Sequence, residues 1–196
     1  MTELEVRIVR LEPMRVASVH AFGEQPEYAA WDKLMAWAGP QGLLKDPEQH
    51  RIFGFNNPDP SPGSPNYGYE FWIAVGRDVE AGPEAQIKEF SGGLYAVARC
   101  KGAHTITETW HKLATWCEDS KHEYGHHQWL EEHLGPVDTP HNDEWCSTCT
   151  CRLRSSGSEQ TGFLPETRFV DLQALLRRQG QRKLDALLNP GPQGVV

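Results

Sequence analysis

The sequence has no apolar run close to the roughly 20 residues that a membrane-spanning helix needs. Its first residues alternate in the manner of a strand and lack the cationic and apolar regions of a signal peptide. The five cysteines are an odd number, which argues against a disulfide framework. These absences predict a soluble, cytoplasmic protein that makes no contact with membranes.

Basic side chains are also few, because 19 Lys and Arg residues stand against 27 Asp and Glu residues. Nucleic-acid binding needs Lys and Arg at the phosphates, so direct binding of DNA or RNA is disfavoured. The acidic character favours cationic ligands instead. Motifs for phosphate or dinucleotide binding and for serine or zinc hydrolysis are missing as well.

An internal repeat is present. A shift of 79 residues aligns two segments of about 30 residues without a gap. The matching cores are Trp31-Asp32-Lys33-Leu34-Met35-Ala36-Trp37 and Trp110-His111-Lys112-Leu113-Ala114-Thr115-Trp116. Such a match predicts a duplicated unit.

Each copy has the pattern of one β-α-β-β unit. A strand with a central break comes first, over residues 6–22 and 86–100, and Pro13 and Gly92-Gly93 mark the breaks. Apolar residues of helical period follow, with Trp31 and Trp110 on the side that faces the core. Further strands are expected at residues 51–55, 67–75 and 128–134. The predicted fold class is α+β with antiparallel sheets.

The last strand of the second copy has two candidates, residues 144–153 and residues 168–176, and we prefer the second. The main domain then comprises residues 1–136 with 168–176, and residues 137–167 form an inserted, cysteine-containing loop. Residues 177–196 are expected to form a short amphipathic helix and a tail rich in proline and glycine.

Three segments and the repeat carry a resemblance to a known family. The segments are Gly54-Phe55-Asn56-Asn57-Pro58, Tyr67-Gly68-Tyr69-Glu70-Phe71-Trp72 and Leu130-Glu131-Glu132. Together with the tandem halves they resemble the GyrI-like effector-binding family. This family provides the ligand-binding module of AraC-type and MerR-type multidrug regulators and also occurs as stand-alone proteins. The resemblance implies two SHS2-type β-α-β-β repeats with a ligand groove at their pseudo-twofold axis.

The resemblance also implies that aromatic rings line this groove and that the penultimate strand supplies a buried carboxylate. Glu131 is the main candidate, since strand alternation puts it on one side with Trp129 and His133 and leaves Glu132 on the other. Which of the two glutamates points inward stays open. A carboxylate among rings attracts a cation, to which each ring adds roughly 0.5–2 kcal/mol. The expected ligand-binding residues are Phe55, Tyr67, Trp72, Trp116, Trp129, Glu132 and His133.

Some stand-alone relatives are similar to hydrolases that open the cyclopropane ring of DNA-alkylating natural products. In that alternative Glu131 activates a water molecule, and Glu70 or the hydroxyl group of Tyr67 or Tyr69 donates the proton. Glu70 shares its strand face with Trp72, so a functional role and a surface-facing position are both open for it.

The three cysteines of Cys146-x-x-Cys149-x-Cys151 provide part of a structural zinc site, and His141 lies just upstream. A second half-site of matching spacing is missing, so reduced thiols in a loop are the alternative. No other cofactor is expected.

The first functional hypothesis is a protein that senses or sequesters amphipathic, cationic or electrophilic small molecules. The second is the hydrolase described above. A third, inhibition of gyrase, is suggested by the family name. No helix-turn-helix segment is found, so a regulatory role requires a separate transcription-factor partner.

Overall fold

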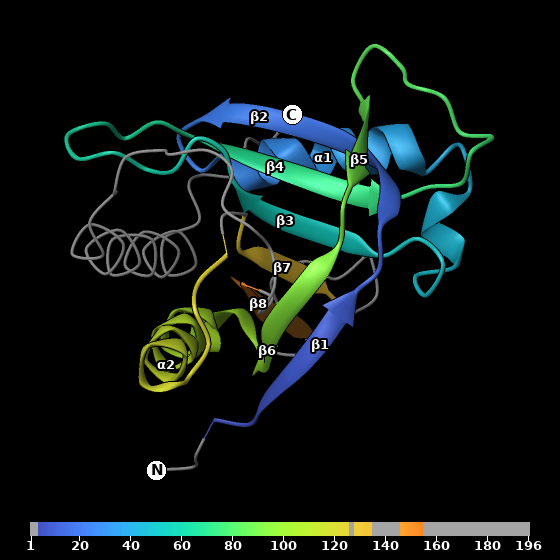
Figure 1. Ribbon diagram of the computed structural model, residues 1–196. Helices are drawn as coiled ribbons and strands as arrows, with labels where there is room; N and C mark the ends of the chain where they lie inside the picture. Colours follow the sequence, from blue (N-terminus) through green and yellow to red (C-terminus); the bar gives the residue numbers. More distant parts are fainter. Residues whose placement is uncertain (1–3, 126–127, 135–145, 155–196) are drawn as a thin grey trace, which may run out of the picture.

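Eight antiparallel strands and two helices make up the part of the chain that the computed structural model describes, residues 4–125, 128–134 and 146–154 (Figure 1). The strands are β1 (Val6–Leu11), β2 (Met14–Gly23), β3 (Ile52–Asn56), β4 (Tyr67–Ala74), β5 (Gln86–Phe90), β6 (Gly93–Lys101), β7 (Leu130–His133) and β8 (Cys146–Leu153). The helices are α1 (Pro26–Ala38) and α2 (Ile106–Asp119), with short 3-10 turns at Leu43–Lys45 and Ala103–Thr105. The predicted α+β class is confirmed.

The strands form one curled sheet in the order β1-β6-β8-β7-β3-β4-β2-β5. The chain bends sharply between β1 and β2 and again between β5 and β6, at the predicted breaks. The two bends touch each other, since a Cβ atom on Gly92 would lie 2.3 Å from the carbonyl oxygen of Leu11. Gly92 also has a φ of 66°, which favours glycine. Each bend therefore sends its two strands to opposite ends of the sheet (Figure 1).

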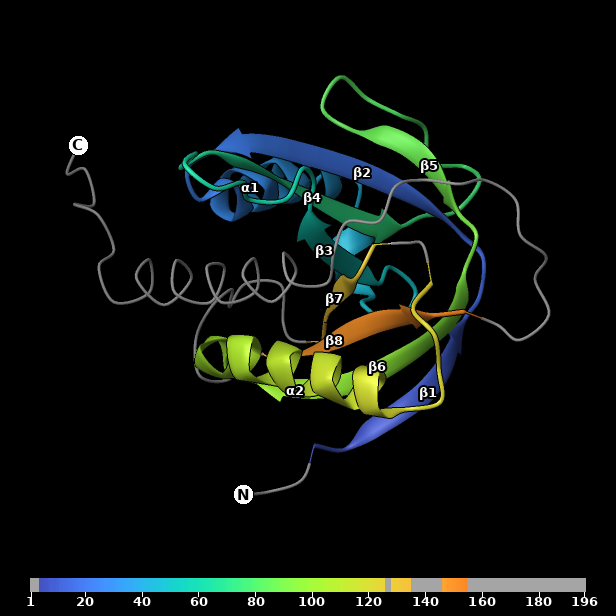
Figure 2. The same cartoon turned by 60° about the vertical axis from the view of Figure 1, so that its left-hand side comes forward.

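Both helices lie on the same side of the central strands β3 and β7, and the bent strands curve around the other side (Figure 2). Helix α1 packs on β2 and β4, while α2 packs on β6 and β8. Trp31 and Trp110 are buried in these helix-sheet cores, as their periodicity predicts. A third core cluster, which includes Phe53, Phe55 and Tyr95, fills the opposite face. We call the two surfaces of the sheet the helix face and the inner face.

The last strand differs from the prediction. Cys146–Leu153 forms β8, which pairs with β6 and β7, although we expected this segment to lie in an inserted loop. Residues 168–176 and 177–196 lie outside the described residues. The segment suits a strand beside α2 because alternate positions contribute Cys151 and Leu153, compact apolar side chains, to that core. Among the helices of the described residues, none is long and apolar enough to cross a membrane.

Candidate functional site

The carboxylate of Glu131 is held by two donors from separate parts of the fold. Glu131 lies on β7 and is only 8% exposed. The hydroxyl group of Tyr69 on β4 donates to Oε2 at 2.9 Å, and the indole Nε1 of Trp110 on α2 donates to Oε1 at 3.0 Å. Each carboxylate oxygen is thus oriented by a rigid aromatic donor. Tyr69 and Trp110 are both distant from Glu131 in the sequence.

Tyr69 reaches Glu131 across the intervening strand β3 because residue 54 is glycine. Gly54 pairs with Phe71 of β4 on one side and with Glu131 of β7 on the other. A Cβ atom on Gly54 would lie 2.6 Å from the hydroxyl oxygen of Tyr69 and 2.9 Å from a ring carbon of Phe71. The missing side chain therefore opens the space through which the tyrosine contacts the carboxylate.

Aromatic rings flank Glu131 along β7. Trp129 stacks on Trp110 with the ring centroids 5.4 Å apart, and His133 stacks on Trp31 of α1 at 5.2 Å. His133 also meets the ring of Phe71 at 5.4 Å. These contacts confirm that Trp129, Glu131 and His133 share one face of the strand. We call this assembly the helix-face site: Tyr69, Phe71, Glu131, His133 and Trp129, with Trp31 and Trp110.

Burial raises the pKa of Tyr69 well above its usual value, and the negative charges of Glu131 and Glu27 raise it further. Tyr69 is 2% exposed. Its hydroxyl group consequently keeps its proton at neutral pH and acts as a hydrogen-bond donor to the carboxylate rather than as an acid.

Glu131 lies on the helix face, whereas Glu132 lies on the inner face of β7. Its Oε1 atom is 2.6 Å from Nε of Arg51, and the Arg51 guanidinium lies over the ring of Phe53 at 5.0 Å. Because Phe53 belongs to the inner-face core, this ion pair is separated from Glu131 by the sheet.

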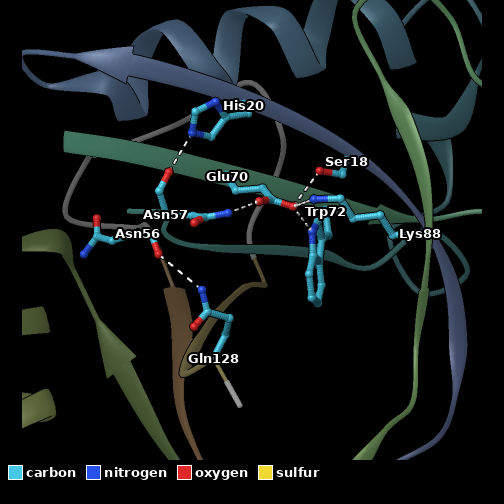
Figure 3. Close-up of polar contacts among 8 residues, drawn as sticks. All are labelled: Ser18, His20, Asn56, Asn57, Glu70, Trp72, Lys88 and Gln128. Atoms are coloured by element: carbon cyan, nitrogen blue, oxygen red, sulfur yellow. Dashed lines mark hydrogen bonds and ion pairs between the residues drawn. The ribbon is translucent and has the colours of Figure 1, made fainter. Parts of the chain in front are cut away.

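Glu70 also lies on the inner face, where four donors surround it (Figure 3). Ser18 Oγ donates to it at 2.6 Å, Asn57 Nδ2 at 2.7 Å and Trp72 Nε1 at 2.5 Å, and the ammonium group of Lys88 forms an ion pair with it. Burial by itself would raise the pKa of Glu70, but the hydrogen bonds from these four groups outweigh burial and lower the pKa. Glu70 is an anion whose charge is compensated.

The structure thus divides the predicted site residues between two faces. Phe55 and Trp72 are packed edge to face at 4.7 Å in the inner-face core, on the side of Glu70. Tyr67, Tyr69, Trp129, Glu131 and His133 lie on the helix face. Trp116 packs at the edge of the α2 core and stacks on His122 at 6.3 Å. The expected combination of Glu70 with Glu131 in one reaction centre is wrong, because a β-sheet lies between them.

Phe71 and Trp31 were not predicted as site residues. Two residues that form polar contacts, Trp110 and Glu27, were not predicted either, although the sequence contains a signal for one of them. Trp110 was expected to be core alone, yet its indole nitrogen binds Glu131. It is the first tryptophan of the repeated motif, and a buried indole needs an acceptor. The other is Glu27, on the first turn of α1, whose two carboxylate oxygens both accept from the hydroxyl group of Tyr67 at 2.8 Å.

The predicted zinc ligands are only partly described. Cys151 is fully buried, and its thiol donates to the backbone carbonyl oxygen of Arg152 at 3.7 Å. The side chains of Cys146 and Cys149 lie outside the described part of the chain. Within the part that is described, no group of three or more His, Cys, Asp or Glu residues is arranged to hold a metal ion. The zinc site stays a prediction.

The described residues thus form a curled antiparallel sheet with two helices on one face and a carboxylate held among rings on that face. The family model of the GyrI-like small molecule binding domain matches residues 4–134. The chain belongs to this GyrI-like family, which confirms the resemblance seen in the sequence. No curated protein matches the chain.

Several solved structures share the fold at low sequence identity. The EcmrR C-terminal domain is 14% identical with a TM-score of 0.61, over 78% of this chain and 99% of that one. The EcmrR chain in the EcmrR–DNA complex is longer, and this chain covers only 58% of it. The identity is again 14% and the TM-score 0.61, over 78% of this chain. A hydrolase from Listeria innocua is 9% identical, with a TM-score of 0.56 over 79% of this chain and 94% of that one. SAV2435 bound to tetraphenylphosphonium is 12% identical, with a TM-score of 0.51 over 77% of this chain and 94% of that one.

Proposed function

We propose that this chain binds amphipathic small molecules that are cationic or electrophilic, and that the helix-face site is where it binds them. The observation that carries the proposal is the orientation of the Glu131 carboxylate by Tyr69 and Trp110 among stacked rings. A carboxylate in such surroundings favours a cation through its charge, and the ring faces add cation–π attraction. The flat rings also bury the apolar part of an amphipathic molecule.

Membership in a family defined by small-molecule binding supports this proposal. Among the structures of the same fold, SAV2435 holds tetraphenylphosphonium, a lipophilic cation. That ligand combines a delocalised positive charge with aromatic surface, which is the chemistry that the helix-face site of this chain would accept. A cytoplasmic role in binding several drugs belongs to the same proposal.

The proposal includes two related halves with a ligand groove between them. The strand order supports it, because β1, β6, β8 and β7 succeed one another as β5, β2, β4 and β3 do from the other end of the sheet. Trp31 and Trp110 are equivalent in the sequence repeat, and each contacts a residue of β7, His133 and Glu131 respectively. The groove would follow β3 and β7, where the two halves meet.

Titration with tetraphenylphosphonium tests the binding function. We expect the wild-type chain to bind the cation, measured by calorimetry and by a change in tryptophan fluorescence. Replacing Glu131→Gln removes the charge while keeping the shape, and should weaken binding by about tenfold, or 1.4 kcal/mol. Glu118→Gln, which changes an exposed glutamate of α2, is the matched control and should bind normally. Equal affinities of wild type and Glu131→Gln would remove Glu131 from the site.

Hydrolysis of cyclopropane-bearing alkylators is the alternative, and the contact between the Tyr69 hydroxyl and Glu131 favours it. Glu131 would take a proton from a water molecule while the oxygen of that water attacks a carbon of the cyclopropane ring. The carbon–carbon bond of the ring would break, and its other carbon would accept a proton. The raised pKa of Tyr69 makes it a poor proton donor, so Tyr69 would position Glu131. Mass spectrometry after incubation with such an alkylator distinguishes the two functions, because only hydrolysis yields a ring-opened product that is heavier by one water.

A further inference from the structure

A second carboxylate adjoins the helix-face site. Glu27 lies in the first turn of α1, and the hydroxyl group of Tyr67 donates to both of its oxygens at 2.8 Å. Tyr67 and Tyr69 are two residues apart on β4, so their side chains project from the same face about 7 Å apart. Neighbouring tyrosines thus bind different carboxylates, Tyr67 that of Glu27 and Tyr69 that of Glu131.

Two further observations place Glu27 beside the site. Glu27 and Trp31 are four residues apart on α1 and therefore share one side of the helix. Trp31 on that side contacts Phe71 and His133 at 5.2 Å each. In addition, the charge of Glu27 raises the pKa of Tyr69 together with that of Glu131, so both carboxylates act on one hydroxyl group.

The described part of the chain, residues 4–125, 128–134 and 146–154, provides no Lys, Arg or His that is paired with Glu27. It lies in the first turn of α1, near the positive end of the helix dipole. Glu70 differs in this respect, since it has Lys88. The helix-face site therefore has a partly buried negative charge at Glu27 in addition to Glu131.

We propose that Glu27 is a second cation-recognition residue, which makes the site selective for elongated aromatic molecules that carry two positive charges. This inference rests on the proposed function. Glu131 would accept the first charge and Glu27 the second, with the rings of Tyr69, Phe71 and Trp31 between them. The strand spacing of the two tyrosines sets the separation of the ligand charges at about 7 Å.

A matched pair of probes tests the inference. Tetraphenylphosphonium carries one charge, while a bis(triphenylphosphonium) with a four-carbon linker carries two on the same kind of aromatic surface. We expect the wild-type chain to bind the dication at least about tenfold more tightly. Glu27→Gln should abolish this preference and leave binding of the monocation within about twofold. Asp32→Asn, at an exposed position of α1, is the control and should keep the preference.

Glu27→Gln keeps one oxygen that can accept from the Tyr67 hydroxyl and replaces the other with an amide donor. Glu27→Gln is therefore also made in a Tyr67→Phe background, where this hydrogen bond is absent from both chains. Circular dichroism melting shows whether each variant is folded. Equal affinity of the wild-type chain for both probes, or an equal loss of both affinities in Glu27→Gln, overturns the role of Glu27 and leaves the proposed function in place. Failure of the wild-type chain to bind either probe overturns the proposed function itself.

Discussion

Glu70 and Glu131 are both buried among aromatic residues, with 2% and 8% of their surfaces exposed, and each accepts a hydrogen bond from a tryptophan. They differ in what balances their charge and in the face on which they lie. Lys88 and three further donors satisfy Glu70 on the inner face, which is opposite to the face that α1 and α2 cover. Glu131 lies beside both helices, between tyrosine and tryptophan donors and stacked rings.

The comparison shows that burial among rings does not by itself identify a ligand-binding acid. A carboxylate that is neutralised by an ammonium group and saturated by neutral donors has nothing further to offer a cation. We therefore propose that Glu70 contributes to stability and Glu131 to ligand recognition. The following substitutions test this division, from the largest expected effect to the smallest.

Glu70→Ala should produce the largest loss of stability. It removes the acceptor shared by Ser18, Asn57 and Trp72 and leaves Lys88 without its partner. We expect the free energy of unfolding to fall by about 3 kcal/mol, measured by urea denaturation. The exposed control Glu118→Ala should change it by less than about 0.5 kcal/mol. A folded Glu70→Ala protein that cannot bind tetraphenylphosphonium would contradict the assignment.

Gly54→Ala should damage the helix-face site and leave the Glu70 network intact. The added Cβ atom would lie 2.6 Å from the Tyr69 hydroxyl, so the tyrosine must move away from Glu131. We expect a loss of about 2 kcal/mol in the free energy of unfolding, as for other overpacked cores, together with weaker ligand binding. A double-mutant cycle with Tyr69→Phe is the check. If Gly54→Ala weakens binding equally in both backgrounds, Gly54 does not act through Tyr69.

Tyr69→Phe removes one hydrogen bond to Glu131 and keeps the ring. We expect it to cost about 1–2 kcal/mol of stability and to weaken binding of tetraphenylphosphonium several-fold, because Glu131 loses one of its orienting donors. Calorimetric titration measures the affinity. Tyr95→Phe on the inner face is the matched control and should bind the cation as the wild type does.

The pH dependence of stability should report on Glu70 in particular. Its pKa is lowered in the folded state, so its ionisation contributes stability that is fully present above the ordinary value of 4.5. That contribution is lost as the pH falls below 4.5 through the lowered value. Urea denaturation between pH 7 and pH 3 should show a smaller loss of stability for Glu70→Gln than for the wild type. If the free energy of unfolding falls equally with pH in the wild type and in Glu70→Gln, the fold does not stabilise Glu70 as an anion.

Much of the local structure could be predicted from the sequence. Helical periodicity identified the buried sides of α1 and α2, which include Trp31 and Trp110. Strand alternation put Trp129, Glu131 and His133 on one face and separated Glu70 from Tyr69. These predictions succeeded because each depends on residues within one element, whose geometry fixes the direction of successive side chains.

Only the tertiary structure decided which side chains of different strands lie next to each other on one face of the sheet. Tyr69 and Glu131 are 62 residues apart, and their contact depends on the pairing of β4 and β7 with β3 and on the space at Gly54. Three further features also depend on contacts between distant parts of the sequence. They are the hydrogen bond from Tyr67 to Glu27, the ion pair of Glu70 with Lys88, and the pairing of Cys146–Leu153 as strand β8. Alternation orders side chains along one strand, whereas pairing across the sheet determines their neighbours.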